Sequence, residues 1–319
     1  MTHIPLLLLA LAWQGPRFDT DTTVSVPAGA RLRLQNQGGD IAIKTWDRNQ
    51  IRIQASHSAR SYVDVDIRGS VVELNTRGRH GMQSVVDYQL TVPASMALDV
   101  GGMYAEISIE GTRAPVKAQT LDGDITLRGG SESVSLSTVN GKIDVSGARG
   151  RIELHAVSED VRATDVQGDL TIESVSGSID LRRIDGKSVD AQSVSGDIIY
   201  DGRLADGGTY SFNTHSGEVT LAVPENSNAT FTLASASGDI SSSYSLRSER
   251  ETRRRHVYRM GDGSATVDVE TFSGDLQIVR PSELRPRRDD DRDAGRIKVK
   301  VKPRPERDRD NDDNQEGGR

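Results

Sequence analysis

Apolar and polar residues alternate along most of the chain, and from Leu98 to Ile278 the alternation follows one repeated pattern. Each copy has two apolar positions two residues apart, a third apolar position three residues later, a small residue two positions further on, and then two more apolar positions. One complete copy reads Leu170, Ile172, Val175, Gly177, Ile179 and Leu181. Because residues two apart lie on the same face of a strand, the pattern predicts two short strands in each copy.

The spacing of the copies predicts how these strands are arranged. The small residue recurs at positions 105, 123, 141, 159, 177, 196, 217, 238 and 274, with steps of 18–21 residues and a last step of 36. The three-residue step, from Leu136 to Val139 for example, breaks the alternation. We interpret it as a corner that lets both side chains point inward. A second turn, such as residues 128–130, closes the coil. The predicted fold is all-β: a parallel β-solenoid (β-helix-like) with two strands per coil of about 18–21 residues, stacked because one coil alone buries too little.

The segment before the repeat has a different character. Residues 23–95 alternate without a fixed period, apart from one outlying copy formed by Leu32, Leu34, Gln37, Gly39, Ile41 and Ile43. Since the open end of a solenoid exposes unpaired strand edges, we expect residues 23–95 to form a β-rich N-terminal cap. Residues 96–281 are then the solenoid repeats.

Two departures from the pattern stand out. The last step contains an insertion at 241–264, predicted to be a basic loop on one face of the solenoid, where such insertions often bind ligands. Its arginines are Arg247, Arg250, Arg253, Arg254, Arg255 and Arg259. The Arg247–Arg259 loop either binds anions, such as acidic glycans or lipid headgroups, or is a solvated hairpin balanced by Glu249 and Glu251. The second departure is Glu159, which occupies a small-residue position and either turns outward or shows that this position is less enclosed.

The two ends of the chain are not part of the repeat. Residues 4–13 are apolar and contain Ala10-Leu11-Ala12, a small-any-small sequence. This predicts a signal peptide over residues 1–12, with a buried first strand as the alternative. The run is shorter than the about 20 residues of a transmembrane helix, and no other stretch is apolar enough, so we expect no transmembrane segment. Residues 282–319 are rich in Arg, Asp, Glu and Pro, which predicts a disordered charged tail.

Composition excludes several classes of function. The 319 residues include no cysteine, which rules out disulfides and thiolate chemistry. The net charge of −7 offers no basic field for nucleic acid. Aromatic residues make up only 4% of the chain, which argues against a cleft that stacks sugars.

No residue pattern points to catalysis, and we predict no catalytic, cofactor-binding or metal-binding residues. Histidine spacing matches no metal motif, and His215 occupies an apolar position, which favours a core or corner role. The residue after the small position is acidic in the last four copies: Asp197, Glu218, Asp239 and Asp275. This acidic ladder either binds Ca²⁺ through carboxylate oxygens or is a solvated, screened face.

A short motif recurs at the small-residue position. Its clearest copies are Ser195-Gly196-Asp197-Ile198, Ser237-Gly238-Asp239-Ile240 and Ser273-Gly274-Asp275-Leu276, and residues 36–43 followed by Trp46-Asp47 have a related pattern. Over about residues 23–280 the chain resembles the bacterial "putative adhesin" β-strand-repeat family DUF4097. The resemblance implies a secreted or envelope-associated β-solenoid without known catalysis, and the label alone is not evidence of adhesion.

Together these observations predict a non-enzymatic, adhesin-like scaffold or interaction protein that is secreted or periplasmic. Its partner is an unidentified protein or glycan of the envelope or cell surface. Two alternatives stay open: a polymer-forming structural protein, because rungs can stack end to end, and a carbohydrate-active enzyme, if an outer groove gathers two carboxylates with basic residues. The sequence leaves self-association undecided.

Overall fold

The computed structural model describes residues 19–58, 61–78, 85–252 and 255–284. The predicted signal peptide and nearly all of the predicted tail lie outside these ranges. The described chain is built of strands, with one short 3-10 helix at Pro281–Glu283. None of the helices in the described part is long and apolar enough to cross a membrane.

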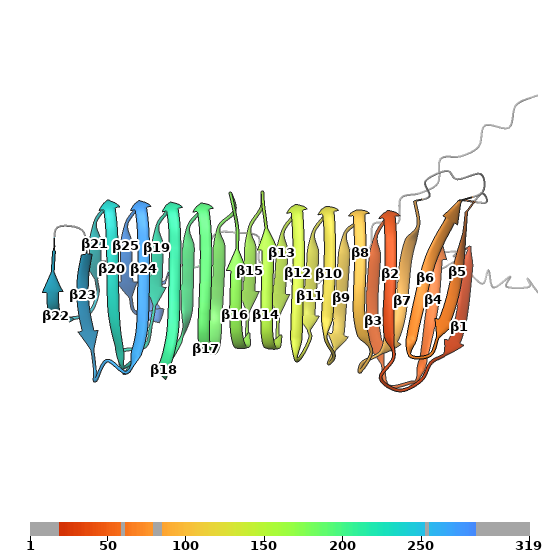
Figure 1. The fold of residues 1–319 in the computed structure, drawn as a ribbon, viewed down its shortest axis with the longest axis horizontal. Coiled ribbons are helices and arrows are strands. Elements are labelled where there is room, and N and C mark those ends of the chain that lie inside the picture. The colour runs from red at the N-terminus through yellow and green to blue at the C-terminus, as the bar shows by residue number, and fades with distance from the viewer. Residues whose placement is uncertain (1–18, 59–60, 79–84, 253–254, 285–319) are drawn as a thin grey trace, which may run out of the picture. The chain divides into compact units, whose positions relative to one another are not determined.

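The described strands belong to one hydrogen-bonded network, because β17 and β18 pass from one face to the other, and they lie in two facing layers that we call the first and second sheets (Figure 1). Each rung contributes one strand to each layer. The first sheet contains, in spatial order, β5 (Ser61–Arg68), β6 (Val71–Gly78), β2 (Arg31–Gly38), β8 (Ala97–Tyr104), β10 (Val116–Asp122), β12 (Ser133–Asn140), β14 (Arg149–Ala156), β16 (Gln167–Glu173), the second halves of β17 (Ile179–Ser195) and β18 (Ile198–Ser216), β24 (Ala265–Ser273), β20 (Ala229–Ser237), β23 (Arg255–Met260) and β22 (Arg247–Glu251). The second sheet contains β1 (Thr20–Ser25), β4 (Gln50–Ser56), β7 (Asp87–Pro93), β3 (Ile41–Trp46), β9 (Ile107–Thr112), β11 (Ile125–Gly129), β13 (Ile143–Ser146), β15 (Val161–Thr164), the first halves of β17 and β18, β19 (Val219–Ala222), β25 (Leu276–Val279) and β21 (Ile240–Ser242).

The predicted parallel β-solenoid is confirmed. Equivalent apolar positions pair between neighbouring rungs, as Val116 does with Val134 and Ile125 with Ile143. Their side chains meet between the two sheets, so one continuous apolar core runs through the rungs. This register explains the repeat, because each apolar side chain packs on its counterparts one rung away.

The N-terminal segment is threaded into the stack. Strands β2 and β3, which carry the copy at Leu32, pair in parallel with β8 and β9 of the first regular coil. Strands β6 and β7 form the next rung outward, and β5, β4 and β1 cover it by antiparallel pairing. The copy at Leu32 is therefore a rung of the solenoid itself.

The C-terminal rungs do not follow chain order. The rung of β24 and β25 lies between the rung of β18 and β19 and the rung of β20 and β21. After β19 the chain leaves the next place in the stack open and forms the rung of β20 and β21 one place further on. It then reverses through the β22–β23 hairpin, and β24 and β25 occupy the place that was left open. The expectation of a loop on one face at 241–264 is wrong, since β23 pairs antiparallel with β20 and extends the first sheet at its end.

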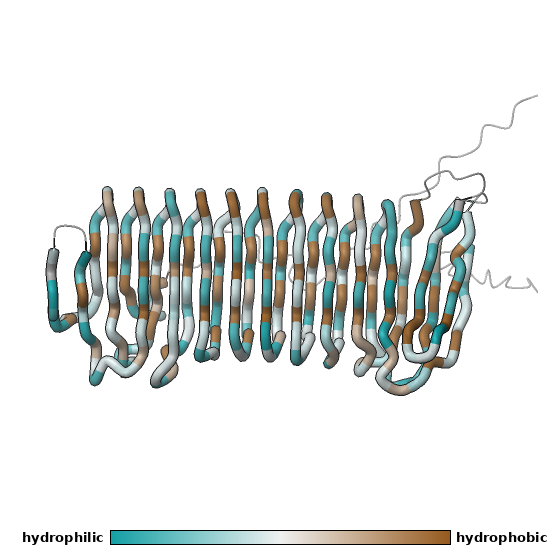
Figure 2. Tube along the Cα trace, viewed as in Figure 1, coloured by the Kyte–Doolittle hydropathy of each residue, from teal (hydrophilic) through white to brown (hydrophobic). Residues whose placement is uncertain are grey.

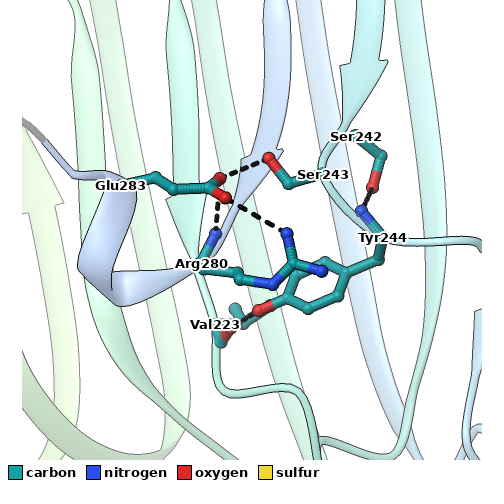
Figure 3. A network of polar contacts seen from close by, with 6 residues as sticks. All are labelled: Val223, Ser242, Ser243, Tyr244, Arg280 and Glu283. Carbon is teal, nitrogen blue, oxygen red and sulfur yellow. Dashed lines mark hydrogen bonds and ion pairs between the residues drawn. The ribbon is translucent and has the colours of Figure 1, made fainter.

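A network of polar contacts stabilises the C-terminal rungs of the solenoid (Figure 3). The Tyr244 hydroxyl donates to the Val223 carbonyl at 2.6 Å, and the Arg280 guanidinium lies over the Tyr244 ring. The carboxylate of Glu283 accepts from Ser243 and from Arg280, and these hydrogen bonds hold the pKa of Glu283 below its ordinary value. The network connects the segment after β21 to the residues that follow β25.

Candidate interaction surface

The corner between the two strands of a rung differs from our expectation. In β10, Thr120 is buried whereas the next residue, Leu121, is 44% exposed. The strand continues its inward–outward alternation up to Thr120, which points inward. The next residue, at the third apolar position, therefore points outward. Our prediction that a corner turns this position inward is wrong, because the inward place belongs to a small polar residue.

That inward residue is a serine or threonine in most rungs. The Thr138 hydroxyl donates to the carbonyl of Gly123 in the neighbouring rung at 3.1 Å, and Thr214 does the same to Gly196 at 3.1 Å. Thr120, Ser193, Ser235 and Thr271 repeat the contact. A buried carbonyl without a partner is costly, so this row of hydroxyls stabilises the corner. In the sequence, this row of hydroxyls is visible as Ser or Thr three residues before the small residue, a feature that the predictions above did not use.

The small residue itself stacks on its counterpart one rung away. A Cβ on Gly141 would lie 2.0 Å from the Gly123 carbonyl oxygen, and one on Gly177 would lie 2.0 Å from that of Glu159. The neighbouring backbone therefore excludes a side chain on that side. Glu159 satisfies the constraint by pointing outward, since it is exposed at an open bend. This decides between the two alternatives for Glu159.

The acidic residue after the glycine has a structural role. The Asp197 carboxylate accepts the amide of Glu218 one rung away at 2.9 Å, and Asp275 accepts that of Asp239 at 2.9 Å. Because the last rung is inserted, Asp275 lies between Glu218 and Asp239 in space. Within the described ranges, no group of three His, Asp or Glu side chains is arranged to hold a metal ion. The Ser-Gly-Asp-Ile motif thus reads as an exposed serine, a stacking glycine, an amide acceptor and a core residue.

The outward third position forms a row that we call the apolar ladder. In spatial order it comprises Met103, Leu121, Val139, Val157, Val175, Val194, His215 and Phe272. Among the described residues, ten large apolar side chains are classed as exposed, and six of them belong to this ladder. Tyr104 and Val85 lie beside its first rungs, because both pair with Gly38. In Figure 2, hydrophobic positions recur at the turns of neighbouring rungs along one edge of the stack.

The rows beside the ladder carry little charge. On the corner side stand Asp122, Asn140, Ser158, Ser176, Ser195, Ser216 and Ser273, all exposed. On the strand side stand Gln119, Ser137, His155, Glu173, Gln192, Asn213 and Glu270. The ring of His155 lies 3.2 Å from the Glu173 carboxylate, so one of these acids already has a partner. An apolar centre with a mostly uncharged polar border is the usual composition of a protein interface.

The ladder ends in an aromatic pair. The rings of His215 and Phe272 are stacked, 4.9 Å apart and 9° from parallel, and Phe272 is 59% exposed. The inserted rung brings them together although they are far apart in the sequence. They line a shallow groove of about 590 Å³ with the side chains of Gln192, Asn213 and Glu270. His215 is therefore an exposed corner residue, and its expected alternative role in the core is wrong.

A second hollow, of about 530 Å³, lies at the same corner nearer the N-terminal rungs. It is lined by the acidic residues Glu106, Asp122, Asp124 and Glu159 together with Lys142. Asp124 already accepts the backbone amide of Lys142 at 2.7 Å. This hollow gathers the residue types that a polysaccharide-cleaving solenoid would need, but on an open surface.

The basic hairpin is partly neutralised. Arg259 forms an ion pair with Glu249 at 2.7 Å, and Arg255 lies 4.0 Å from Asp268. Arg253 and Arg254 lie outside the described residues. The hairpin therefore contributes to the end of the sheet, and anion binding by Arg247–Arg259 stays a prediction.

These features define the class: the protein is a two-sheet β-solenoid with an apolar outer ladder. The Toastrack DUF4097 family model matches residues 30–279, so the chain belongs to that family and the expected resemblance is confirmed. One similar solved structure is a "putative cell adhesion protein" from Clostridium sporogenes, with 10% identity, a TM-score of 0.22, and coverage of 82% of this chain and 99% of that chain. Another is a "putative adhesin" from Parabacteroides distasonis, with 10% identity, a TM-score of 0.40, and coverage of 81% and 96%. A search of curated proteins found no significant match.

Proposed function

We propose that this chain is a non-enzymatic scaffold of the cell envelope or exterior that binds a partner through the apolar ladder. The observation that carries the proposal is the continuity of the ladder. Its eight rungs extend for about 38 Å at about 4.8 Å per rung. Single exposed apolar side chains are common on protein surfaces, but a contiguous row of them marks an interaction site.

An extracytoplasmic location supports the same function. It rests on the predicted signal peptide at residues 1–12. Immunoblotting of fractionated native cells tests it directly. We expect the protein in the periplasmic, envelope or culture-medium fraction, and a purely cytoplasmic signal would contradict this part of the proposal.

A binding role is preferred over catalysis because of how the carboxylates are used. The acids of the second hollow lie on an open surface, and Asp124 already accepts a backbone amide. A general acid normally has a pKa raised by an enclosed environment. We therefore expect no release of reducing ends when the purified protein is incubated with bacterial polysaccharides. Release that disappears in Glu159→Gln would favour the enzyme instead.

A paired substitution tests the binding surface. In Val157→Ser/Val175→Ser, two adjacent ladder positions become polar, while Thr126→Ser/Thr164→Ser changes two outward positions of the second sheet. The measurement is the fraction of the protein that elutes in complexes larger than the monomer when a native-cell extract is separated by size-exclusion chromatography. We expect the ladder variant to shift to the monomer fraction while the control stays in the larger complexes. If both variants elute like the unchanged protein, the ladder is not the binding surface.

A further inference from the structure

We propose that the partner of the apolar ladder is a second copy of this chain, docked ladder to ladder with the two solenoids antiparallel. This inference rests on the proposed function, because it names the occupant of the same surface. The two-fold axis passes between the rungs of Val157 and Val175, which is the midpoint of the eight-rung ladder. Such an interface uses the same patch on both copies, as two-fold dimers do.

The periodicity of the ladder favours this partner. A second solenoid presents apolar side chains at the same spacing of about 4.8 Å, so every rung meets a rung along the whole ladder. About the proposed axis, Val157 faces Val175 of the second copy, and Val139 faces Val194. At the ends, Met103 faces Phe272, a favourable sulfur–aromatic contact.

The borders of the ladder are compatible with the same arrangement. In an antiparallel pair each border row faces itself, so His155 lies opposite Glu173 of the second copy. Ser137 then lies opposite Gln192, and Ser158 lies opposite Ser176. The nearest border rows bring no two like charges face to face about this axis, and the small serines let the copies approach closely. The carboxylate of Glu173 is the acid beside the axis, and there it faces the imidazole of His155 of the second copy, while the ladder positions at the centre are uncharged valines.

The area fits a reversible dimer. Eight rungs of about 4.8 Å and three outward positions across give a strip of roughly 500–600 Å² per copy. The total is near the lower end of standard protein interfaces, which begin at about 1,200 Å². We therefore expect a dimer that dissociates on dilution.

The edge strands of the solenoid disfavour end-to-end association, so we expect two copies to associate through their sides. The edge strands are β1 and β5 at one end and β21 and β22 at the other. β1 and β22 are polar or charged, β21 is only three residues long, and β5 alternates apolar residues with Asp64 and Asp66; short and charged edge strands disfavour edge-to-edge pairing.

The absence of cysteine gives a clean test with single-cysteine variants of the full chain. Val139→Cys and Val194→Cys are purified separately, mixed, and treated with a bis-maleimide that spans about 10 Å, the distance between packed sheets. We expect a covalent dimer in the mixture. Each variant alone should form little covalent dimer, because in the antiparallel pair identical positions are three rungs, or about 14 Å, apart along the ladder.

Two further results complete the test. Val175→Lys buries two ammonium groups beside the axis, so light scattering across a dilution series should show its dimer weakened at least tenfold, while Thr126→Lys behaves like the unchanged protein. Crosslinking of each cysteine variant with itself would mean parallel pairing and overturn the proposal. A monomer at every concentration would also overturn it. If that monomer still enters ladder-dependent complexes in native-cell extracts, the proposed function stands with a different partner. If it enters none, both proposals are contradicted.

Discussion

At the residue scale, each position of the repeat is explained by a contact with the neighbouring rung. The glycine makes room for a carbonyl, the hydroxyl satisfies that carbonyl, and the aspartate accepts the next amide. The glycine and core positions were recognisable from the sequence because they recur in most copies, and the acidic position was recognisable in the last four copies. The direction of the third apolar position was not, since apolar residues at a corner suit either an inward or an outward place. Only the buried hydroxyl before it, such as Thr120 before Leu121, reveals the outward direction.

Substitution of a stacking glycine tests this account of the corner. Gly141→Ala places a Cβ 2.0 Å from the Gly123 carbonyl oxygen, and the backbone must shift. We expect a loss of about 2–4 kcal/mol in the free energy of unfolding, measured by urea denaturation. Gly147→Ala, in the same rung, is the control: its φ is +69°, but nothing lies within 4 Å of the added Cβ. It should cost only about 1–2 kcal/mol, and equal losses would argue against the stacking contact.

The buried tyrosines predict how stability depends on pH. Burial raises the pKa of Tyr200 well above its usual value and also raises the pKa values of Tyr88 and Tyr210. Below about pH 10 the phenols are neutral in both folded and unfolded chains. Above it the unfolded chain ionises first, so stability falls as pH rises towards the folded-state pKa values.

Thermal unfolding of Tyr200→Phe measures this effect. At neutral pH the variant should lose about 1 kcal/mol, because the hydroxyl no longer donates to the Arg203 carbonyl at 3.1 Å. Its further loss between about pH 9 and 11 should be smaller than that of the unchanged protein. Tyr62→Phe, at a 48% exposed position, serves as the control. An unchanged alkaline slope in Tyr200→Phe would contradict the explanation.

At the element scale, the solenoid was predictable but the order of its terminal rungs was not. Strand pattern and spacing identify the segments of the regular rungs, and the copies at Leu32 and Val267 were both recognised as copies of the repeat. The rung of β6 and β7 carries no copy of the pattern and was not recognised. Every rung offers the same apolar positions to its neighbours, so the pattern alone does not say which rung is adjacent to which. Two hairpins, β5–β6 and β22–β23, reverse the chain and decide the order.

Truncation tests the inserted rung. A chain that ends at Gly263 lacks β24 and β25, so β18 and β20 lose the strand between them. Loss of one rung removes several buried apolar side chains, and we expect the melting temperature to fall by roughly 10 °C or more. A chain that ends at Arg285 keeps every described strand and is the control, with a melting temperature close to that of the full chain. A small effect of the shorter truncation would mean that the rung is peripheral.

At the scale of the whole molecule, the described solenoid ends in antiparallel or short strands, and one of its sides carries a row of exposed apolar residues. The sequence predicted a capped stack and a protein without a recognisable catalytic motif. It did not reveal the proposed interaction surface, because the pattern alone suggests that Leu121, Val157 and Val175 are core residues. Their exposure is visible only once the alternation of each strand is placed in space.

The most direct test of the central claim is site-specific photo-crosslinking in native cells. A photoreactive phenylalanine analogue replaces Val175 in the ladder or, as the control, Thr126 on the outward face of the second sheet. We expect discrete crosslinked products at position 175 and none at 126, and mass spectrometry should identify a second copy of this chain in them. No product at position 175, or the same products at both positions, would contradict the claim that the apolar ladder is the surface through which this protein acts.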